Sequence, residues 1–229
     1  MPQPLNSPDE NIRANRKKWD RDHTWPEDGD EWKGQSVDCG VSYADWKQSL
    51  IDNLIAPNVT SDMHVLEIAP GHGRWTEALV DRARNVSAVD LSQNCLDFCR
   101  ARFADQNIAF FLTDGTSLPA GLTGSIDFLW SYDAFVHMAP GVIKAYLHEI
   151  ARVLKSGSSA IIHHSGIENP DTHEQRGSRG WRSAVSAAMM RGFAEAAGLK
   201  VLAQITYWDE ARGIGVPRNN DKITTVQKP

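Results

Sequence analysis

The stretch "VLEIAPGHGRW" (residues 65–75) decides the fold class of this sequence. It is an apolar run with one acid, Glu67, that breaks into a loop where one residue separates Gly71 from Gly73. A second apolar run, "VSAVDLS", follows at 86–92 and carries Asp90 near its end. A strand, a glycine turn, a helix and a second strand in this order are typical of the repeating unit of a parallel sheet.

Strands and helices alternate along the rest of the chain. We expect strands over 63–69, 86–91, 108–114, 125–133, 158–166, 199–208 and 222–227. We expect helices over 43–55, 74–83, 92–104, 142–154 and 182–197. This alternation predicts an α/β fold, a Rossmann-like doubly wound sheet, mostly parallel, with helices on both faces. No helix separates the last two strands, so we expect them to pair antiparallel, and ligands to bind at the carboxyl ends of the parallel strands.

The composition bounds the class of protein. The chain has 229 residues with 41% hydrophobic content, which suits one domain with a small appendage. A net charge of −5 argues against binding to nucleic acid or to an anionic membrane surface. No run approaches the ~18 apolar residues of a membrane span, and the polar N-terminus resembles neither a signal peptide nor a transit peptide. Three cysteines make no disulfide framework, so we expect reduced thiols and a cytoplasmic protein. No feature selects an oligomeric state.

The N-terminal part differs from the rest. We expect residues 1–40 to be an arm or lid and residues 41–229 to be the main domain. The arm is polar and has too few aliphatic side chains for a core, so it is either disordered or lies on the main domain through its tryptophans. A lid over a pocket, or ordinary capping of the core edge, would use Trp25, Trp32, Trp75 and Trp181.

The glycine turn does not match the fingerprint of dinucleotide-binding proteins. The sixth position counted from Gly71 is Thr76, and counted from Ala69 it is Arg74, where that fingerprint needs glycine or alanine. Glu67 lies just before the turn and would repel a pyrophosphate. An acid at this place favours a cationic ligand, which the glycines allow to approach the backbone closely.

Two further acids end the next strands. Asp90 can accept hydrogen bonds from both hydroxyls of a ribose, or it can be the N-cap of the following helix, as Ser92 also can. Asp114, in "LTDGTSLP", can accept from an adenine amino group, or it can be a turn or cap residue.

Five motifs in order resemble class I methyltransferases that depend on S-adenosylmethionine (SAM), over residues of about 40–228. These motifs are "VLEIAPGHG", "VDLS", "TDGTSLP", "IDFLWSYDAFVHM" and "RVLKSGSSAIIHH". The resemblance implies SAM as cofactor and a seven-stranded sheet whose last strand is inserted antiparallel. The chain departs from the family at Ala69, where glycine is usual, and at Ser156-Gly157, where Pro-Gly is frequent. Alanine is tolerated at 69 if the backbone keeps a negative φ.

We therefore expect a cofactor site built from the turn and the ends of the first four strands. Its predicted contacts are Trp25, Trp32, Glu67, Ala69, Gly71, Gly73, Trp75, Asp90, Leu91, Asp114, Gly115, Thr116 and Ser131.

Candidate catalytic residues follow the fourth and fifth predicted strands. Asp133 and His137 lie in "SYDAFVHM", and His163 and His164 lie in "IIHHSG". Alternation along a strand points the two adjacent histidines to opposite faces, so we expect only one of them in the cleft. A histidine there can remove the proton of a hydroxyl acceptor, or each can be a buried packing residue.

The resemblance also implies that the chain could hold a divalent metal ion. In the metal-dependent small-molecule O-methyltransferases of this family, an acid after the fourth strand and an Asp-Asp or Asp-Asn pair after the fifth hold a divalent cation. Asp133 matches the first position, but His163-His164 replaces the pair, which disfavours Mg²⁺. A softer divalent metal held by Asp133 and His164, or direct base catalysis by histidine, stays open.

The expected acceptor is a small polar molecule. "SYDAFVHM", "IIHHSG" and "GWRS" are similar to motifs of bacterial methyltransferases in natural-product pathways, including sugar O-methyltransferases. This favours O-methylation of a sugar or a glycosylated metabolite. His173 lies in a loop that either covers the acceptor or is simply solvated. N-methylation of a small amine, or SAM binding without transfer, are the alternatives.

Overall fold

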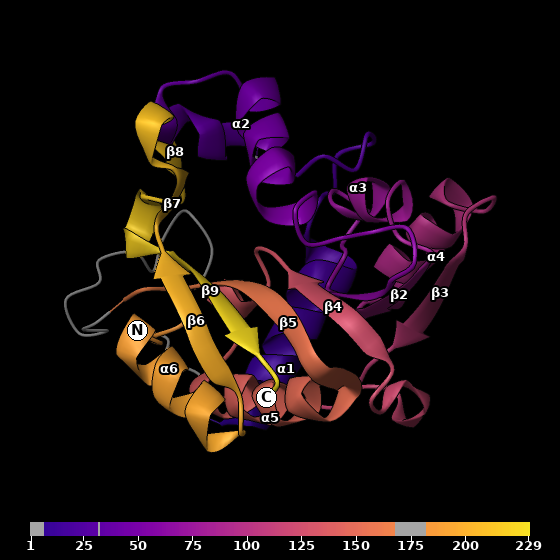
Figure 1. Ribbon diagram of the computed structural model, residues 1–229. Helices are drawn as coiled ribbons and strands as arrows, with labels where there is room; N and C mark the ends of the chain where they lie inside the picture. Colours follow the sequence, from indigo (N-terminus) through magenta and orange to yellow (C-terminus); the bar gives the residue numbers. More distant parts are fainter. Residues whose placement is uncertain (1–6, 32, 168–181) are drawn as a thin grey trace.

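The computed structural model describes residues 7–31, 33–167 and 182–229. Its seven-stranded sheet has the order β3-β2-β1-β4-β5-β9-β6 (Figure 1). The strands are β1 (His64–Ile68), β2 (Asn85–Asp90), β3 (Ile108–Leu112), β4 (Ile126–Ser131), β5 (Leu154–His164), β6 (Lys200–Ile205) and β9 (Lys222–Gln227). The first five pair parallel, whereas β9 runs antiparallel between β5 and β6. The predicted fold class and the inserted last strand are confirmed.

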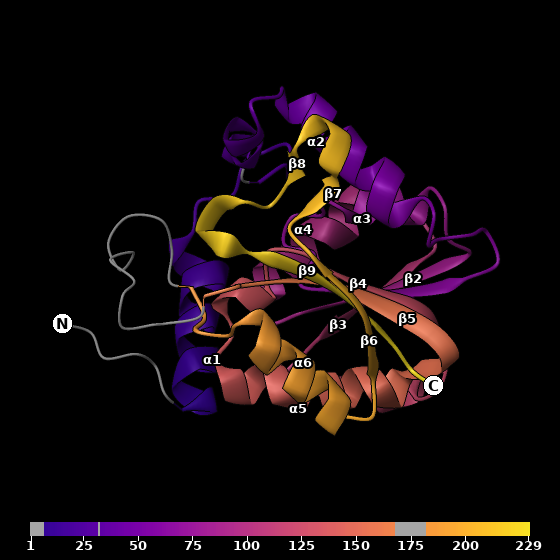
Figure 2. The same cartoon turned by 60° about the vertical axis from the view of Figure 1, so that its left-hand side comes forward.

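Helices cover both faces of the sheet. The α-helices are α1 (Pro8–Lys17), α2 (Tyr43–Leu50), α3 (Thr76–Val80), α4 (Gln93–Arg102), α5 (Pro140–Val153) and α6 (Ala187–Ala196). Figures 1 and 2 show α5 and α6 on one face and α2 and α3 on the other, with α1 beside one end of α5. None of the helices in the described part of the chain is long and apolar enough to cross a membrane.

Several elements differ from their predicted extent: α2 ends at Leu50 before a π-helical turn, β5 begins at Leu154 and α6 begins at Ala187. The predicted helix over 74–83 is the shorter α3, because the turn continues to Trp75 before helical hydrogen bonding starts. The predicted strand over 199–208 is split: β6 ends at Ile205, and β7 (Tyr207–Asp209) leaves the sheet to pair with β8 (Ile214–Gly215). The indole of Trp208 explains the split, because it packs 5.4 Å from the ring of Trp46 and donates to the hydroxyl of Ser49.

Apolar side chains fill both faces. One core lies under α5 and α6 and contains Leu129, Ile143 and Leu147, all fully buried. The other lies under α2 and α3 and is rich in aromatic rings, with Trp46 and Trp130 at zero exposure. Strands β1, β2 and β4 are buried almost throughout because helices cover both faces of the sheet, and their parallel pairing places their carboxyl ends at one edge.

The arm lies on the main domain, which is the second of the two predicted alternatives. Ser7 caps α1 by accepting from the backbone N–H of Glu10, and Pro8 occupies the first helical turn. Asn11 of α1 is 1% exposed: its amide donates to the carbonyl of His137 and accepts from the N–H of Ala139. A polar anchor therefore attaches the arm in addition to its tryptophans. Trp32 lies outside the described residues.

Candidate active site

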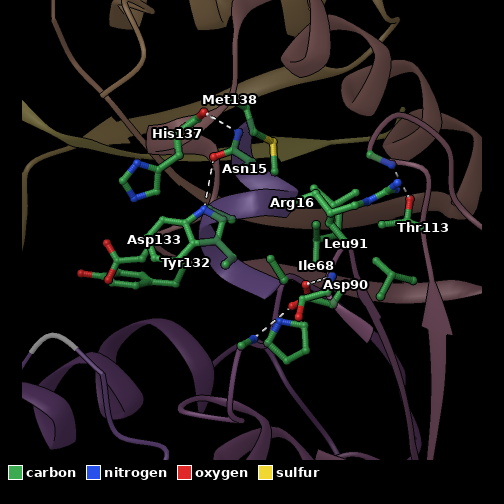
Figure 3. A pocket seen from close by; sticks show the side chains of 18 of the residues that line it. Asn15, Arg16, Ile68, Asp90, Leu91, Thr113, Tyr132, Asp133, His137 and Met138 are labelled. Atoms are coloured by element: carbon green, nitrogen blue, oxygen red, sulfur yellow. Dashed lines mark hydrogen bonds between the residues drawn. The ribbon is translucent and has the colours of Figure 1, made fainter. Parts of the chain in front are cut away.

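A cavity lies beyond the carboxyl ends of β1, β2 and β4, and the arm covers it (Figure 3). One end is lined by Asp90, Leu91 and Thr113, and the other by Tyr132, Asp133 and His137. The arm contributes Asn11, Ile12, Asn15, Arg16, Trp19 and Trp25. The cavity therefore joins the predicted cofactor end to the predicted catalytic end.

The glycine turn has the backbone that the sequence predicts. Gly71 and Gly73 adopt φ values of +57° and +88°, in the left-handed region that favours glycine. A Cβ on Gly71 would lie 2.7 Å from the ring of Trp25, and one on Gly73 would lie 2.5 Å from Phe103. Gly71 lines the cavity, whereas Gly73 allows the turn to pack on α4.

Ala69 lines the cavity but does not keep the negative φ expected for an alanine there. Its φ is +60°, and its N–H donates to the carbonyl of Val89 over 2.7 Å. A Cβ in this region meets the neighbouring carbonyl and costs about 1–2 kcal/mol. The replacement of the usual glycine is therefore strained, because the negative φ under which alanine would cost little is not adopted.

Asp90 is the acid that faces the cavity. Its two oxygens accept from the N–H groups of Ser92 (2.8 Å) and Gly71 (3.2 Å). Burial raises the pKa of Asp90 to about 6, although these N–H donors favour the ionised form. Ser92, and not Asp90, caps α4 through the N–H of Cys95. The carboxylate is thus left to a ligand, with Leu91 beside it.

Glu67 and Ser131 are buried beneath the site and do not line the cavity. The carboxyl group of Glu67 accepts from the hydroxyl of Thr76 in α3 over 2.6 Å. Burial raises the pKa of Glu67 to about 8, so the group is mostly protonated at neutral pH. The expectation that its charge selects the ligand is corrected: Glu67 joins β1 to α3. Ser131 similarly donates to the carbonyl of Ile68 and joins β4 to β1.

Asp114 and Thr116 also lie outside the cavity lining. Asp114 is exposed, and its Oδ1 accepts from the N–H groups of Thr116 and Ser117, as in the turn that was the alternative interpretation. Thr113 and Gly115, on either side of Asp114, line the cavity. Asp114 therefore does not make the predicted contact with adenine. Of the three predicted contacts Asp114, Gly115 and Thr116, Gly115 alone lines the cavity.

Aromatic rings of the arm continue the cavity wall. Trp25 stacks on His72 of the glycine turn at 4.8 Å, and His72 stacks on Phe98 of α4 at 3.7 Å. Trp19 lies 6.1 Å from Trp25 and 5.0 Å from the ring of His137. Trp75 lines the cavity from the domain side, as predicted. Trp181 and His173 lie outside the described residues.

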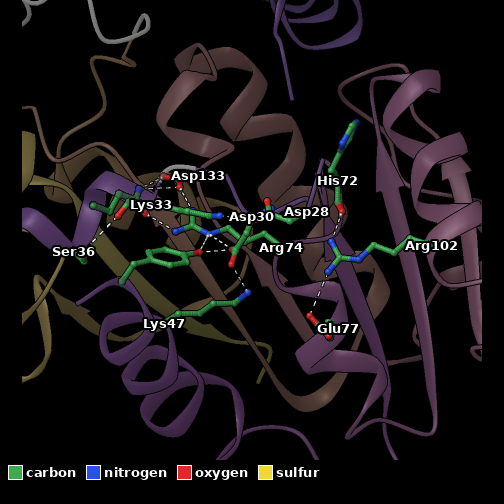
Figure 4. A network of polar contacts seen from close by, with 12 residues as sticks. Asp28, Asp30, Lys33, Ser36, Lys47, His72, Arg74, Glu77, Arg102 and Asp133 are labelled. Atoms are coloured by element: carbon green, nitrogen blue, oxygen red, sulfur yellow. Dashed lines mark hydrogen bonds and ion pairs between the residues drawn. The ribbon is translucent and has the colours of Figure 1, made fainter. Parts of the chain in front are cut away.

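Asp133 is the centre of a polar network (Figure 4). Its carboxylate accepts from Nη1 of Arg74 (3.0 Å) and twice from the amide of Gln35 (2.8 and 2.9 Å). Nδ1 of His163 lies 3.1 Å from Oδ1. Burial opposes ionisation, but His163 and Arg74 outweigh it and hold the pKa of Asp133 well below its usual range. Asp133 has a φ of +61°, a strained backbone conformation that the surrounding contacts have to hold in place.

Arg74 and Gln35 are site residues that the sequence did not single out. Arg74 is 5% exposed, and its guanidinium lies over the rings of Trp75 (4.8 Å) and Trp46 (5.3 Å). Its Nε donates to the hydroxyl of Tyr43. One feature of the sequence could have indicated Arg74. It is a cation inside the stretch of residues 65–75 and precedes an apolar helix that has to be buried.

The adjacent histidines of β5 point to opposite faces, as predicted, and both are fully buried outside the cavity lining. His163 lies between Asp133 and Asp221. Burial lowers the pKa of His163, but these two carboxylates outweigh it and raise the value. His164 bonds the carbonyl of Ser165 and the hydroxyl of Thr224, and burial lowers its pKa to about 4.

The structure thus corrects the predicted metal pair. Asp133 and His164 lie on different sides of β5, because alternate residues of a strand face opposite ways. Within the described ranges, no three His, Cys, Asp or Glu side chains are placed to hold a metal ion. Of the three predicted histidines, His137 alone lines the cavity.

Comparison with known proteins agrees with this geometry. A family model described as "Methyltransferase domain" matches residues 65–157. The biotin biosynthesis bifunctional protein BioHC of Cellvibrio japonicus is 34% identical over 98 residues, which are 43% of this chain and 19% of that protein. The chain thus spans about a fifth of the length of this curated relative.

Solved structures share the fold at low sequence identity. A methyltransferase in complex with the Trm112 activator of Haloferax volcanii has a TM-score of 0.64 at 22% identity, covering 87% of this chain and 98% of that one. A SAM-dependent methyltransferase of Clostridium acetobutylicum has a TM-score of 0.61 at 17% identity, covering 83% and 94%. The family model thus matches a methyltransferase domain over part of the chain, and the solved structures share its fold.

Replacing Ala69 by glycine should stabilise the protein. Glycine removes the strain at φ +60°, and the gain exceeds its extra entropy in the unfolded chain, so we expect the free energy of unfolding to rise by about 1 kcal/mol. Urea denaturation measures it. Ala145→Gly, in the middle of α5, is the matched control and should lose about 1 kcal/mol. Equal losses for both variants would show that position 69 carries no strain.

Replacing Glu67 by glutamine should flatten the pH dependence of stability. The folded protein holds the proton of Glu67 up to about pH 8, whereas a glutamate in the unfolded chain has an ordinary pKa of 4.5, so the free energy of unfolding falls as pH rises between these values. From about pH 5 to about pH 8, the wild type should lose at least ~1 kcal/mol more than Glu67→Gln. Thermal and urea unfolding at both pH values measure this difference. Parallel pH profiles would mean that Glu67 is ionised in the fold.

Proposed function

We propose that the chain transfers a methyl group from SAM to a hydroxyl of a small polar metabolite, a sugar or a glycosylated natural product. The single observation that supports this most is the continuous cavity between Asp90 and His137. The residues at its first end fit the cofactor: Asp90 offers carboxylate oxygens to ribose hydroxyls, and Gly71 leaves the backbone accessible. When bound, SAM supplies an electrophilic methyl group.

The chain then has to align the acceptor and remove its proton. Alignment of two reactants can contribute about 7–11 kcal/mol, and a positioned base about 10²–10⁴-fold in rate. Asp133 is a poor base, because its pKa is held low and its oxygens are occupied by Arg74, Gln35 and His163. His137 lines the cavity at the acceptor end, and we assign it the role of base.

The alternatives keep the same cavity. A small amine acceptor would need no strong base, because a free amine is already nucleophilic. SAM binding without transfer is the other alternative. One similar structure is described as the [4+2]-cyclase SpnF. It has a TM-score of 0.59 at 17% identity and covers 82% of this chain and 81% of that one. A shared fold therefore does not determine the reaction.

His137→Ala should separate these functions. With a hydroxyl acceptor, loss of the base should lower kcat by about 10²–10⁴-fold while SAM still binds. A screen with methyl-labelled SAM against sugars, glycosides and small amines identifies the acceptor, and calorimetry with S-adenosylhomocysteine checks the cofactor site. His148→Ala, an exposed histidine of α5, is the control. Unchanged turnover in His137→Ala would refute the base, and absence of both transfer and nucleoside binding would refute the function.

We also propose that the arm, residues 1–40, is a lid on a methyltransferase domain of residues 41–229. Three contacts support it. Trp25 covers Gly71, Ile12 lies 3.0 Å from where a Cβ of Gly115 would be, and Asp20 accepts from the hydroxyl of Ser92 over 2.7 Å. The arm therefore touches every strand end that the nucleoside would contact, and the cofactor has to pass it.

Trypsin should detect the lid. Arg16, Lys17, Lys18 and Arg21 are exposed cleavage sites on the arm. S-adenosylhomocysteine should slow cleavage at these sites, because closing the arm protects its backbone. Asn11→Ala should speed cleavage several-fold without ligand, because its two anchoring hydrogen bonds are lost. Arg13→Lys, at an exposed position, is the control, and equal cleavage with and without ligand would rule out the lid.

A further inference from the structure

Arg16 of the arm lies at the cofactor end of the cavity. Its side chain is exposed and lines the cavity, and Figure 3 shows it at the end where Leu91 and Thr113 lie. Within the described residues, its guanidinium has no hydrogen-bond or ion-pair partner. An exposed arginine on a helix is ordinarily solvated, as Arg13 is on the same helix, but Arg13 does not line the cavity. Arg16 therefore offers a positive charge to a ligand in the cavity.

Contacts on both sides determine where Arg16 lies. Ile12, four residues earlier, is 3.0 Å from where a Cβ of Gly115 would be, in the loop after β3. Asp20, four residues later, accepts from the hydroxyl of Ser92 over 2.7 Å, in the loop after β2. Side chains four residues apart lie on one side of a helix. Arg16 therefore lies over the gap between the ends of β2 and β3.

A nucleoside bound to Asp90 would place its base in this gap. Asp90 ends β2 and offers its carboxylate to the ribose hydroxyls. Leu91 and Thr113 are the lining residues at the ends of the same two strands. A base attached to that ribose would extend over them, and it would then lie beneath Arg16.

The acceptor side chains at this end are engaged in their own turn. Oδ1 of Asp114 accepts from the N–H of Ser117 over 2.8 Å. The hydroxyl of Thr113 donates to the carbonyl of Ser117 over 2.7 Å and accepts from the N–H of Gly115 over 3.2 Å. A guanidinium has donors and no acceptor, so it can stack on a base or donate to ring nitrogens, but it cannot accept from an amino group.

We propose that Arg16 recognises the purine base of the cofactor, and that the 6-amino group of adenine does not select the ligand. This inference rests on the proposed function of the cavity and identifies the part of the cofactor that α1 contacts. The guanidinium covers the base and shields it from water, so the base itself helps to hold the arm on the domain.

Calorimetry with S-adenosylhomocysteine and S-inosylhomocysteine tests the role of the amino group. The inosine form has a 6-oxo group in place of the amino group and keeps N7 as an acceptor. We expect the wild type to bind the two forms within about threefold of each other, because Arg16 can stack on both and donate to both. A preference above about tenfold for the adenosine form would show that an acceptor reads the amino group, and it would overturn the proposal.

Arg16→Met tests the residue, with Arg13→Met as the matched control. Arg16→Met should weaken both homocysteine nucleosides and 5′-methylthioadenosine about tenfold, because a stacked and partly desolvated cation is lost. Arg13→Met should leave all three affinities unchanged. Methylthioadenosine has the base but no carboxylate. If its affinity stayed the same while that of S-adenosylhomocysteine fell, Arg16 would bind the carboxylate, and the proposal would be wrong.

Stability separates recognition from attachment of the arm. Neither Arg16→Met nor Arg13→Met removes a partner within the described residues, so we expect equal Tm values for the two ligand-free variants. A lower Tm for Arg16→Met would show that Arg16 holds the arm in place, and it would overturn the proposed contact with the base.

The outcomes also separate this inference from the proposed function. Nucleoside binding that Arg16→Met leaves unchanged, in a protein that transfers methyl groups, would overturn the inference alone. Binding that depends on Arg16, without transfer to any acceptor, would refute the proposed function alone. Absence of binding of all three nucleosides to the wild type would refute both.

Discussion

The ion pair between Arg74 and Asp133 holds the cavity in its shape, because it joins the glycine turn to the loop after β4. Both charges are largely buried, and a buried pair is tolerated only when other groups satisfy its remaining bonds. Gln35 of the arm, Tyr43 of α2 and His163 of β5 do so. The network thus connects four separate segments around one carboxylate, and it explains why Asp133 keeps a left-handed backbone.

The same network determines which groups are left for chemistry. Asp133 is a poor base because Arg74, Gln35 and His163 contact its carboxylate, whereas His137 and Tyr132 line the cavity. At the other end, Asp90 is the acid exposed to a ligand, because Glu67 is turned toward α3. Of the three acids expected at the strand tips, Asp90 alone lines the cavity, together with backbone groups and aromatic rings.

The arm covers both ends of the cavity. Trp25 stacks on His72 of the glycine turn, Trp19 packs at a tilt against His137, and the two indoles lie 6.1 Å apart. Movement of the arm would consequently change the cofactor end and the acceptor end together. In a fold of this class the strand ends form a fixed edge of the site. A segment such as the arm adds a wall to the site and shields it from water.

Periodicity and local spacing in the sequence determined the alternating elements, the mostly parallel sheet, the glycine turn and Asp90, because each depends on neighbouring residues. The insertion of the last strand was implied by the family resemblance. Alternation also put His163 and His164 on opposite faces. Only the tertiary structure decided that neither reaches the cavity, since the register of β5 against β4 and β9 sets what each face meets. It likewise decided the positive φ of Ala69, the protonation of Glu67 and the role of Arg74, because these depend on long-range packing and burial.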